Sequence, residues 1–116
     1  MKYLCMIYFD EQRLETMPAE ESAACIRDSK ANNEALRKSG HLIAAHALES
    51  VSMATTVRHH EGRVSATDGP FAETKEQLGG FVLIEARDLD EAIGIASNHP
   101  AGRLGCVEVR PIATLE

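Results

Sequence analysis

Four segments of the chain have the hydrophobic pattern of β-strands. In two of them apolar residues stand at nearly every position, and in the other two they alternate with polar residues. Lys2 to Phe9 and Gly79 to Ala86 are apolar at odd and even positions alike, which is typical of strands that are covered on both faces. His41 to Leu48 carries a weaker alternation, and Gly105 to Pro111 alternates valines with polar residues as a half-buried strand does. The pattern therefore predicts four strands that belong to one hydrophobic core.

Two other segments have helical spacing. The first begins near Met17, where Pro18 and the acids after it suit a first helical turn, and it ends at Gly40. The second opens on a capping box, Asp88-Leu89-Asp90-Glu91, and ends before Pro100. The predicted inward stripe of the first helix is Ala23, Ile26, Asn33 and Leu36, and that of the second is Leu89, Ala92, Ile93 and Ala96.

A hairpin interrupts this pattern. Ala54 to His60 and Arg63 to Thr67 are β-branched or alternating, and Glu61-Gly62 between them is a turn signal. The order β-α-β-hairpin-β-α-β predicts an α+β fold, a ferredoxin-like sandwich in which one mainly antiparallel sheet carries two helices on one face. A chain of 116 residues has room for one such core, so we expect a single domain over residues 1–116.

The other face of this sheet lacks a cover in the predicted arrangement. The two strands that are apolar on both faces would leave a larger apolar patch in water than a soluble monomer usually tolerates. A second copy packed sheet against sheet about a two-fold axis would bury it, which predicts a homodimer in the form of a dimeric α/β barrel. The alternative is that the hairpin folds back over this face.

Composition and charge narrow the range of partners. The formal net charge of -6 repels a phosphate backbone, so we expect no nucleic-acid partner. No apolar stretch approaches the length of a membrane span, and the N-terminus lacks the pattern of a secretory signal, so we expect a cytoplasmic protein with no membrane partner.

Cys5, Cys25 and Cys106 are too widely spaced for a disulfide framework or a Cys-x-x-Cys motif. His59 and His60 are adjacent on a strand and point to opposite faces, and no nucleotide-binding or nucleophile-elbow motif occurs, so neither a metal nor a cofactor is expected.

The stretch Thr67-Asp68-Gly69-Pro70-Phe71-Ala72-Glu73-Thr74-Lys75-Glu76-Gln77-Leu78-Gly79-Gly80-Phe81 concentrates turn residues and ionisable residues without a hydrophobic period. It resembles the DGPF signature of the YCII-related family, and the resemblance extends over nearly the whole chain, from Lys2-Tyr3-Leu4 to Val107 through Ile112. The resemblance implies a dimeric α+β barrel. It also implies distant kinship with enzymes that act on small ring compounds, and for the DGPF branch an association with extracytoplasmic-function sigma factors. The His and Asp pair of some family members has no residue-by-residue match in this chain.

Asp68 is the first candidate for chemistry, because a carboxylate ahead of a tight turn can serve as a general base where burial raises its pKa. The structural alternative is an Asx-turn, in which this carboxylate bonds its own backbone two residues on. His46 can form an acid/base pair with Asp68 if its strand faces the same cleft; otherwise it is a surface histidine or one whose hydrogen bonds are satisfied within the fold.

His99, at a helix end, most simply interacts with the C-terminal helix dipole. Thr74, Lys75 and Glu76 are candidates for binding a polar ligand, with a solvated loop as the alternative.

Two functions follow from these candidates. One is a small-molecule enzyme that performs cofactor-free acid/base chemistry in a cleft near the Asp68 to Glu76 loop, with Asp68 and His46 as acid and base. The other is a non-catalytic module that binds a ligand or a partner, in line with the sigma-factor association that the resemblance implies. Composition does not separate them.

Overall fold

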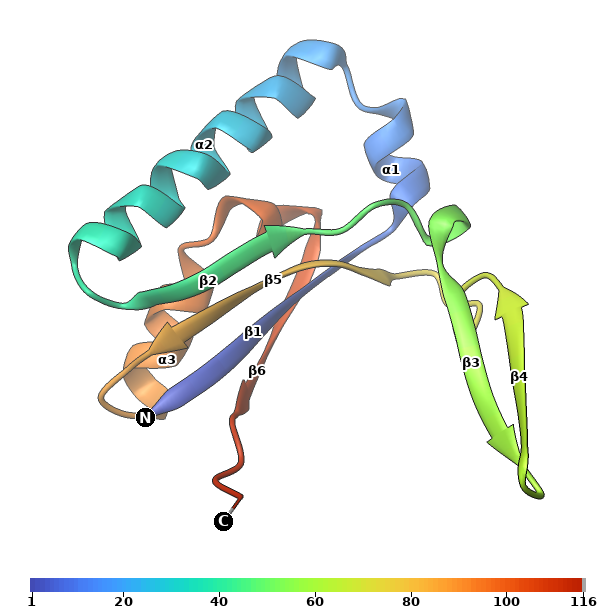
Figure 1. Cartoon of the computed structure of the whole chain (residues 1–116). Helices are drawn as coiled ribbons and strands as arrows, with labels where there is room; N and C mark the ends of the chain where they lie inside the picture. Colours follow the sequence, from blue (N-terminus) through green and yellow to red (C-terminus); the bar gives the residue numbers. More distant parts are fainter. Residues whose placement is uncertain (116) are drawn as a thin grey trace.

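The core of the computed structural model, which describes residues 1–115, is a four-stranded antiparallel sheet (Figure 1). Its strands are β1 (Lys2–Phe9), β2 (Leu42–Ala47), β5 (Gln77–Glu85) and β6 (Gly105–Pro111), in the order β2-β5-β1-β6. β1, the most apolar segment, lies inside the sheet and pairs with both β5 and β6. This arrangement is a mixed α+β fold that agrees with the predicted ferredoxin-like sandwich.

Helices α2 (Ala19–Lys38) and α3 (Leu89–Ser97) lie on the same face of this sheet. α3 is packed closely, with Ala92 and Ala96 buried, whereas α2 has no buried residue and contributes Leu36, a partly buried hydrophobic residue, to the packing against the core cluster. The cluster consists of side chains from the helix-facing side of β1 and β5 and from α3: Tyr3, Cys5, Ile7, Val82, Ile84, Ala86, Ala92 and Ala96. The predicted stripe on α2 was wrong in part, because Ile26 is 59% exposed.

Short helical segments that the sequence pattern did not predict connect these elements. α1 (Glu11–Thr16) follows β1 and is capped by Asp10, whose carboxylate accepts a hydrogen bond from the Gln12 backbone N–H. Two 3₁₀ turns, η1 (Val51–Met53) and η2 (Pro100–Leu104), precede β3 and β6. A six-residue polar helix has too few turns to show a hydrophobic period, which is why its segment was predicted only as polar chain.

The hairpin forms a sheet of its own. β3 (Thr55–His60) and β4 (Arg63–Asp68) pair only with each other, through a turn at Glu61 and Gly62 with φ of 48° and 77°, the signature of a type I′ turn. The hairpin extends away from the four-stranded sheet (Figure 1), and the radius of gyration of 16.0 Å exceeds the roughly 13 Å of a compact domain of about this length. The single-sheet prediction was therefore wrong, and so was the alternative in which the hairpin folds back over the open face.

The open face of the four-stranded sheet carries large apolar side chains. Leu4 pairs with Leu83 and Met6 with Phe81, and all four are only half-buried. On β6 this face becomes polar, because Glu108 and Arg110 lie beside Met6 and Leu4. The Tyr8 hydroxyl donates to Glu108 at 3.2 Å, and Arg110 forms an ion pair with the same carboxylate. The hydrogen bond from Arg110 is the main cause that lowers the pKa of Glu108. The pKa of Tyr8 is raised, chiefly by partial burial and in second place by the contacts with Glu108.

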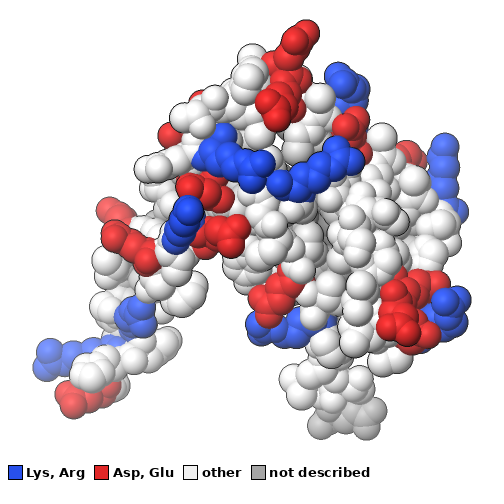
Figure 2. All heavy atoms as spheres, turned by 180° about the vertical axis from the view of Figure 1, so that it is seen from behind, with Lys and Arg blue, Asp and Glu red and all other residues white. Residues whose placement is uncertain are grey.

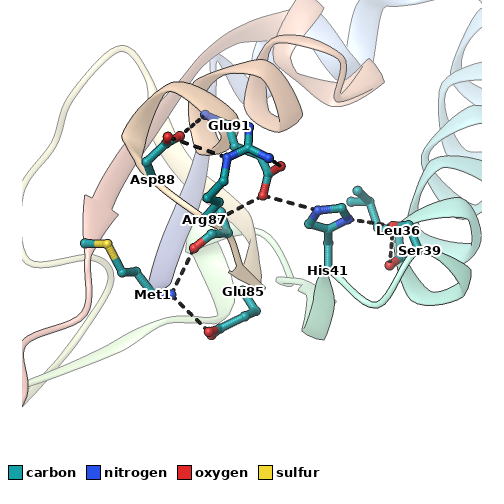
Figure 3. Close-up of polar contacts among 9 residues, drawn as sticks. Met1, Leu36, Ser39, His41, Glu85, Arg87, Asp88 and Glu91 are labelled. Atoms are coloured by element: carbon teal, nitrogen blue, oxygen red, sulfur yellow. Dashed lines mark hydrogen bonds and ion pairs between the residues drawn. The ribbon is translucent and has the colours of Figure 1, made fainter.

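A chain of polar contacts fixes the C-terminal end of α2 to the start of α3 (Figure 3). His41 lies 2.7 Å from the Ser39 hydroxyl and 3.4 Å from the Glu91 carboxylate. Asp88 caps α3 by accepting from the Glu91 N–H, which confirms the predicted cap, while Glu91 accepts from the Arg87 N–H. The Arg87 backbone hydrogen bond is the main reason that the pKa of Glu91 is lowered. α2 is therefore held at its C-terminal end, away from the segment that borders the cavity described next.

Candidate functional site

A cavity of about 540 Å³ lies between α2 and the helix-facing side of the sheet. Its walls come from α1, α2, β1, β2, β5 and the segment around η2, and they are predominantly apolar. The lining residues are Ile7, Phe9, Leu14, Ser22, Cys25, Ile26, Ser29, Lys30, Asn33, Ala45, His46, Ala47, Leu48, Gly79, Gly80, Phe81, His99, Ala101 and Leu104. Small-molecule sites are typically concave, largely apolar and about 300–1,000 Å³ in volume, so this cavity has the size and character of one.

The sequence of α2 explains why this space is not filled. The residues that face the cavity recur every three or four positions, and most of them are small or polar: Ser22, Cys25, Ile26, Ser29, Lys30 and Asn33. Large apolar side chains on this stripe would have closed the gap, and no residue of α2 is fully buried. On the sheet side Gly79 and Gly80 add no bulk; a Cβ on Gly79 would lie 2.1 Å from the Phe9 ring. The polar stripe on α2 was the signal in the sequence that could have revealed the cavity.

His99 is the most deeply buried polar residue bordering this cavity, with 8% of its surface exposed. Its Nδ1 accepts a hydrogen bond from the Ala101 N–H at 3.2 Å, so the neutral ring carries its proton on Nε2. Burial lowers the pKa of His99, which favours this neutral form. The interpretation of His99 as a charged partner of the helix dipole was therefore wrong: the residue caps η2 as an acceptor.

The Nε2–H of His99 and the Oδ1 of Asn33 are both buried, and neither has a hydrogen-bond partner within residues 1–115. An unpaired polar atom that is shielded from solvent costs about 1–3 kcal/mol, so such atoms need an explanation. One of the two is a donor and the other an acceptor, and both residues border the same cavity. Sequence reasoning placed Asn33 among the packing residues of the helix and missed this polar pair.

A second, smaller hollow of about 380 Å³ lies on the other side of His99, among α3, η2 and β6. It is lined by apolar residues such as Val107 and by the polar residues Ser97 and Arg103. His99 thus forms part of the wall between the two spaces. The larger one is the candidate site, because it has more volume and more apolar wall.

The comparisons with known proteins place the chain in a family. The family model described as the YCII-related domain matches residues 1–116. The chain belongs to the YCII-related family. It is 38% identical over 115 residues to the uncharacterised protein R00369 of Rhizobium meliloti (strain 1021), covering 97% of this chain and 93% of that protein. It is similar in fold to the 5-chloro-2-hydroxyhydroquinone dehydrochlorinase (TftG) of Burkholderia phenoliruptrix AC1100, solved in complex with 2,5-dihydroxybenzoquinone. That likeness has a TM-score of 0.56 at 17% identity and covers 97% of this chain and 94% of that one.

Asp68 of this YCII-related protein lies at the base of the hairpin, exposed and outside the cavity lining. Within residues 1–115 its carboxylate accepts no hydrogen bond. The Asx-turn interpretation is wrong, because the residue two positions on is Pro70, which has no N–H to donate. The turn is held instead by the Gly69 N–H, which donates to the Ala54 carbonyl, and by the Thr56 hydroxyl, which donates to the Gly69 carbonyl at 2.7 Å.

His46 lies on β2 and is exposed. Its neighbour Ala45 pairs with the buried Val82, so the His46 side chain points to the open face, where its ring lies 5.7 Å from that of Phe81. Its strand segment borders the cavity, but no hydrogen bond or ion pair within the described chain joins His46 to Asp68.

The loop candidates Thr74, Lys75 and Glu76 are exposed and lie outside the cavity lining. The Thr74 hydroxyl donates to the Glu76 carbonyl at 2.6 Å, and the Gln77 side chain donates to the Thr74 carbonyl at 3.1 Å. These contacts order the loop locally. The structure therefore brings Thr74 and Glu76 together but separates this loop from the lining of the cavity.

The charges of this YCII-related protein are interspersed. Figure 2 shows acidic and basic side chains mixed over the face seen there, without an extended area of one sign. No helix within residues 1–115 is long and apolar enough to cross a membrane. The face seen in Figure 2 thus carries no charged patch that would compete with the cavity as the candidate site.

Proposed function

We propose that this YCII-related protein is a small-molecule enzyme that binds its substrate in the cavity under α2 and performs cofactor-free acid/base chemistry on it. The observation that carries the proposal is the large, mostly apolar cavity with a neutral, buried histidine in its wall. The fold neighbour supports it by analogy, because that protein is named as a dehydrochlorinase of a hydroquinone and was solved with a quinone.

The cavity suits a flat or compact organic molecule. Its apolar walls can hold a ring or a branched hydrocarbon body, and burial of that body supplies most of the binding free energy. A neutral imidazole can donate a hydrogen bond to a carbonyl or phenolic oxygen and so stabilise negative charge that develops there during proton transfer. Lys30, an exposed residue of α2 that borders the cavity, adds a positive charge that favours an electron-rich ligand.

A ligand screen tests the proposal directly. We expect small cyclic compounds with oxygen substituents to raise the melting temperature of the protein in a concentration-dependent way, because a ligand that binds only the folded state stabilises it. Compounds that bind are then followed by absorbance and chromatography for conversion in the presence of the protein. Binding with no conversion by the protein would favour the alternative of a binding module. No observation on the structure or among the relatives favours a sigma-factor link.

The sequence proposes Asp68 and His46 as the proton-transfer groups. Asp68 is exposed and outside the cavity lining, and the His46 side chain points to the open sheet face, so their role is tested separately from the cavity, by Asp68→Asn. The carboxylate makes no contact within the described chain, so we expect the denaturation midpoint to stay unchanged. If Asp68 is the general base, turnover of a substrate found in the screen falls by about two to four orders of magnitude, because asparagine cannot accept the proton. Turnover equal to that of the wild type would remove Asp68 from the mechanism and leave the cavity residues as its centre. His46→Asn, assayed in parallel, tests the second member of the pair.

We also propose that the protein is a homodimer that buries the open sheet face, in the manner of an α/β barrel. Leu4, Met6, Phe81 and Leu83 form an apolar strip on that face, and no described element of the chain covers it. Light scattering at micromolar concentration is expected to give about twice the 12.6 kDa mass of one chain. Met6→Glu places a charge in the middle of the strip and is expected to give monomers. A wild-type protein that is monomeric at these concentrations would contradict the proposal.

A further inference from the structure

We propose that the β3–β4 hairpin, residues 55–68, is an arm that grips a second copy of the chain through one of its two faces. This inference rests on the homodimer proposed above and adds to it a contact surface outside the open sheet face. It is independent of what the cavity under α2 binds.

The two faces of the arm differ in chemical character. Residues that pair directly across an antiparallel ladder lie on the same face, and side chains alternate between the faces along each strand. Val57 pairs with Ala66, and Val64 lies two positions before Ala66, so all three share one face. On this face Val57 is 57% exposed and Val64 is 63% exposed. The residues of the opposite face are all polar or charged: Thr56, Arg58, His60, Arg63, Ser65 and Thr67.

The chain itself engages the polar face of the arm. The Thr56 hydroxyl donates to the Gly69 carbonyl at 2.7 Å, and the Arg58 side chain donates to the Phe71 carbonyl at 2.9 Å. The segment that follows β4 is therefore bonded to the polar face. A hairpin that served only its own chain would turn its apolar face to the core and its polar face to water. The reversed arrangement leaves the apolar face to a surface outside the chain.

The rest of the chain gives the arm little support. A two-stranded hairpin with no sheet or helix packed on it is at best marginally stable in water. Apart from Thr56, every residue of β3 and β4 is exposed. No other described strand pairs with either of them. The arm therefore gains order from a contact that residues 1–115 do not supply.

A second copy of the chain lies where the arm can reach it. In Figure 1 the arm runs downward from the four-stranded sheet, whereas α2 lies above that sheet. The open sheet face is the one opposite α2. A copy packed on the open face therefore lies beside the arm, and by the two-fold symmetry its own arm lies beside the first chain.

The area of the two surfaces supports this partner. Four strands at a spacing of about 4.8 Å and about 23 Å in length present a planar face of about 400 Å². A stable interface buries about 800 Å² on each partner, so the sheet face supplies about half of that area. One face of a two-stranded arm about 20 Å long covers about 200 Å². Because each copy both gives an arm and receives one, the arms add about 400 Å² per copy and supply the other half.

Val64→Asp tests the arm. The change places a carboxylate in the apolar face, and Val64 is exposed in the single chain, so the fold of one protomer loses no core packing. We expect the dissociation constant of the dimer, measured by sedimentation at several concentrations, to rise by about tenfold or more, because the contact would desolvate the charge.

Ser65→Asp is the matched control. Ser65 is the next residue of the same strand, is also exposed, and lies on the polar face. The same charge therefore enters the arm without entering the proposed contact. We expect the dissociation constant of the dimer to change by about twofold or less. Far-UV circular dichroism checks that both variants are folded.

Photo-cross-linking tests the contact directly. A photoreactive phenylalanine analogue at position 64 is expected, on irradiation, to give a band at about twice the 12.6 kDa chain mass on a denaturing gel. The same analogue at position 65 is expected to give at most a minor band. Since the gel separates chains that are not covalently joined, the band reports a bond between two copies.

The outcomes separate the arm from the proposals on which it rests. A wild-type protein that is monomeric at micromolar concentration would overturn the homodimer and the arm together. A dimer whose dissociation constant is unchanged by Val64→Asp, or that gives no cross-linked band from position 64, would overturn the arm alone, leaving its apolar face to a different protein. Neither result bears on the enzyme proposal, which the ligand screen tests.

Discussion

Ser29→Phe is expected to abolish ligand binding in the cavity under α2 while the protein stays folded. Ser29 lies in the middle of the inner stripe of α2 and borders the cavity. A phenyl group at this position occupies space that the ligand needs, and it fills an open volume, so it does not overpack a closed core. We expect the affinity for a ligand found in the screen to fall by about 100-fold or more, which corresponds to about 2.7 kcal/mol.

The measurement is a titration of wild type and variant with the same ligand, by calorimetry or by the shift in melting temperature. Ala31→Phe is the control, because Ala31 is exposed on the same helix and lies outside the lining. It is expected to bind as the wild type does. If Ser29→Phe binds with wild-type affinity, the ligand lies elsewhere and the cavity is not the site.

Ile84→Ala is expected to lower the free energy of unfolding by about 2–5 kcal/mol. Ile84 lies on β5 and is 0% exposed, the largest fully buried side chain of the described chain. Alanine leaves a cavity in a closely packed region between β1, β2 and α3, because the strands on either side cannot move inward without breaking their ladder. Chemical denaturation followed by circular dichroism measures the change.

Ile93→Ala provides the comparison, because Ile93 is on α3 but 46% exposed. It is expected to cost clearly less, since a half-exposed side chain gives up less buried surface. Equal losses for the two variants would mean that the core is centred differently from the cluster around Ile84.

The sequence by itself determined the elements of the four-stranded sheet and the two main helices. Period-two and period-3.6 patterns, the cap at Asp88 and the Glu61-Gly62 turn are local signals, because each depends on backbone geometry within a few residues. Given those elements in that order, few sheet topologies remain, and the ferredoxin-like one is the observed one. The Asp68 segment carried the family resemblance, which the family model confirms at the level of the YCII-related domain.

Only the tertiary structure decided where the candidate site lies. His99 is the N-cap of η2 and Asn33 lies on α2, more than sixty residues apart in the sequence, and nothing local to either residue predicts that both border one cavity. The tertiary structure also decided that the hairpin extends away from the main sheet, since the same alternating strands can pair with the main sheet or with each other. The sequence suggested Asp68 and His46 as an acid/base pair, but no hydrogen bond or ion pair within the described chain joins them. Strand alternation turns His46 to the open face, and Asp68 lies on the hairpin strand β4. Burial and non-local contact arise only after the chain is packed, and they decide which polar atoms are left without a partner.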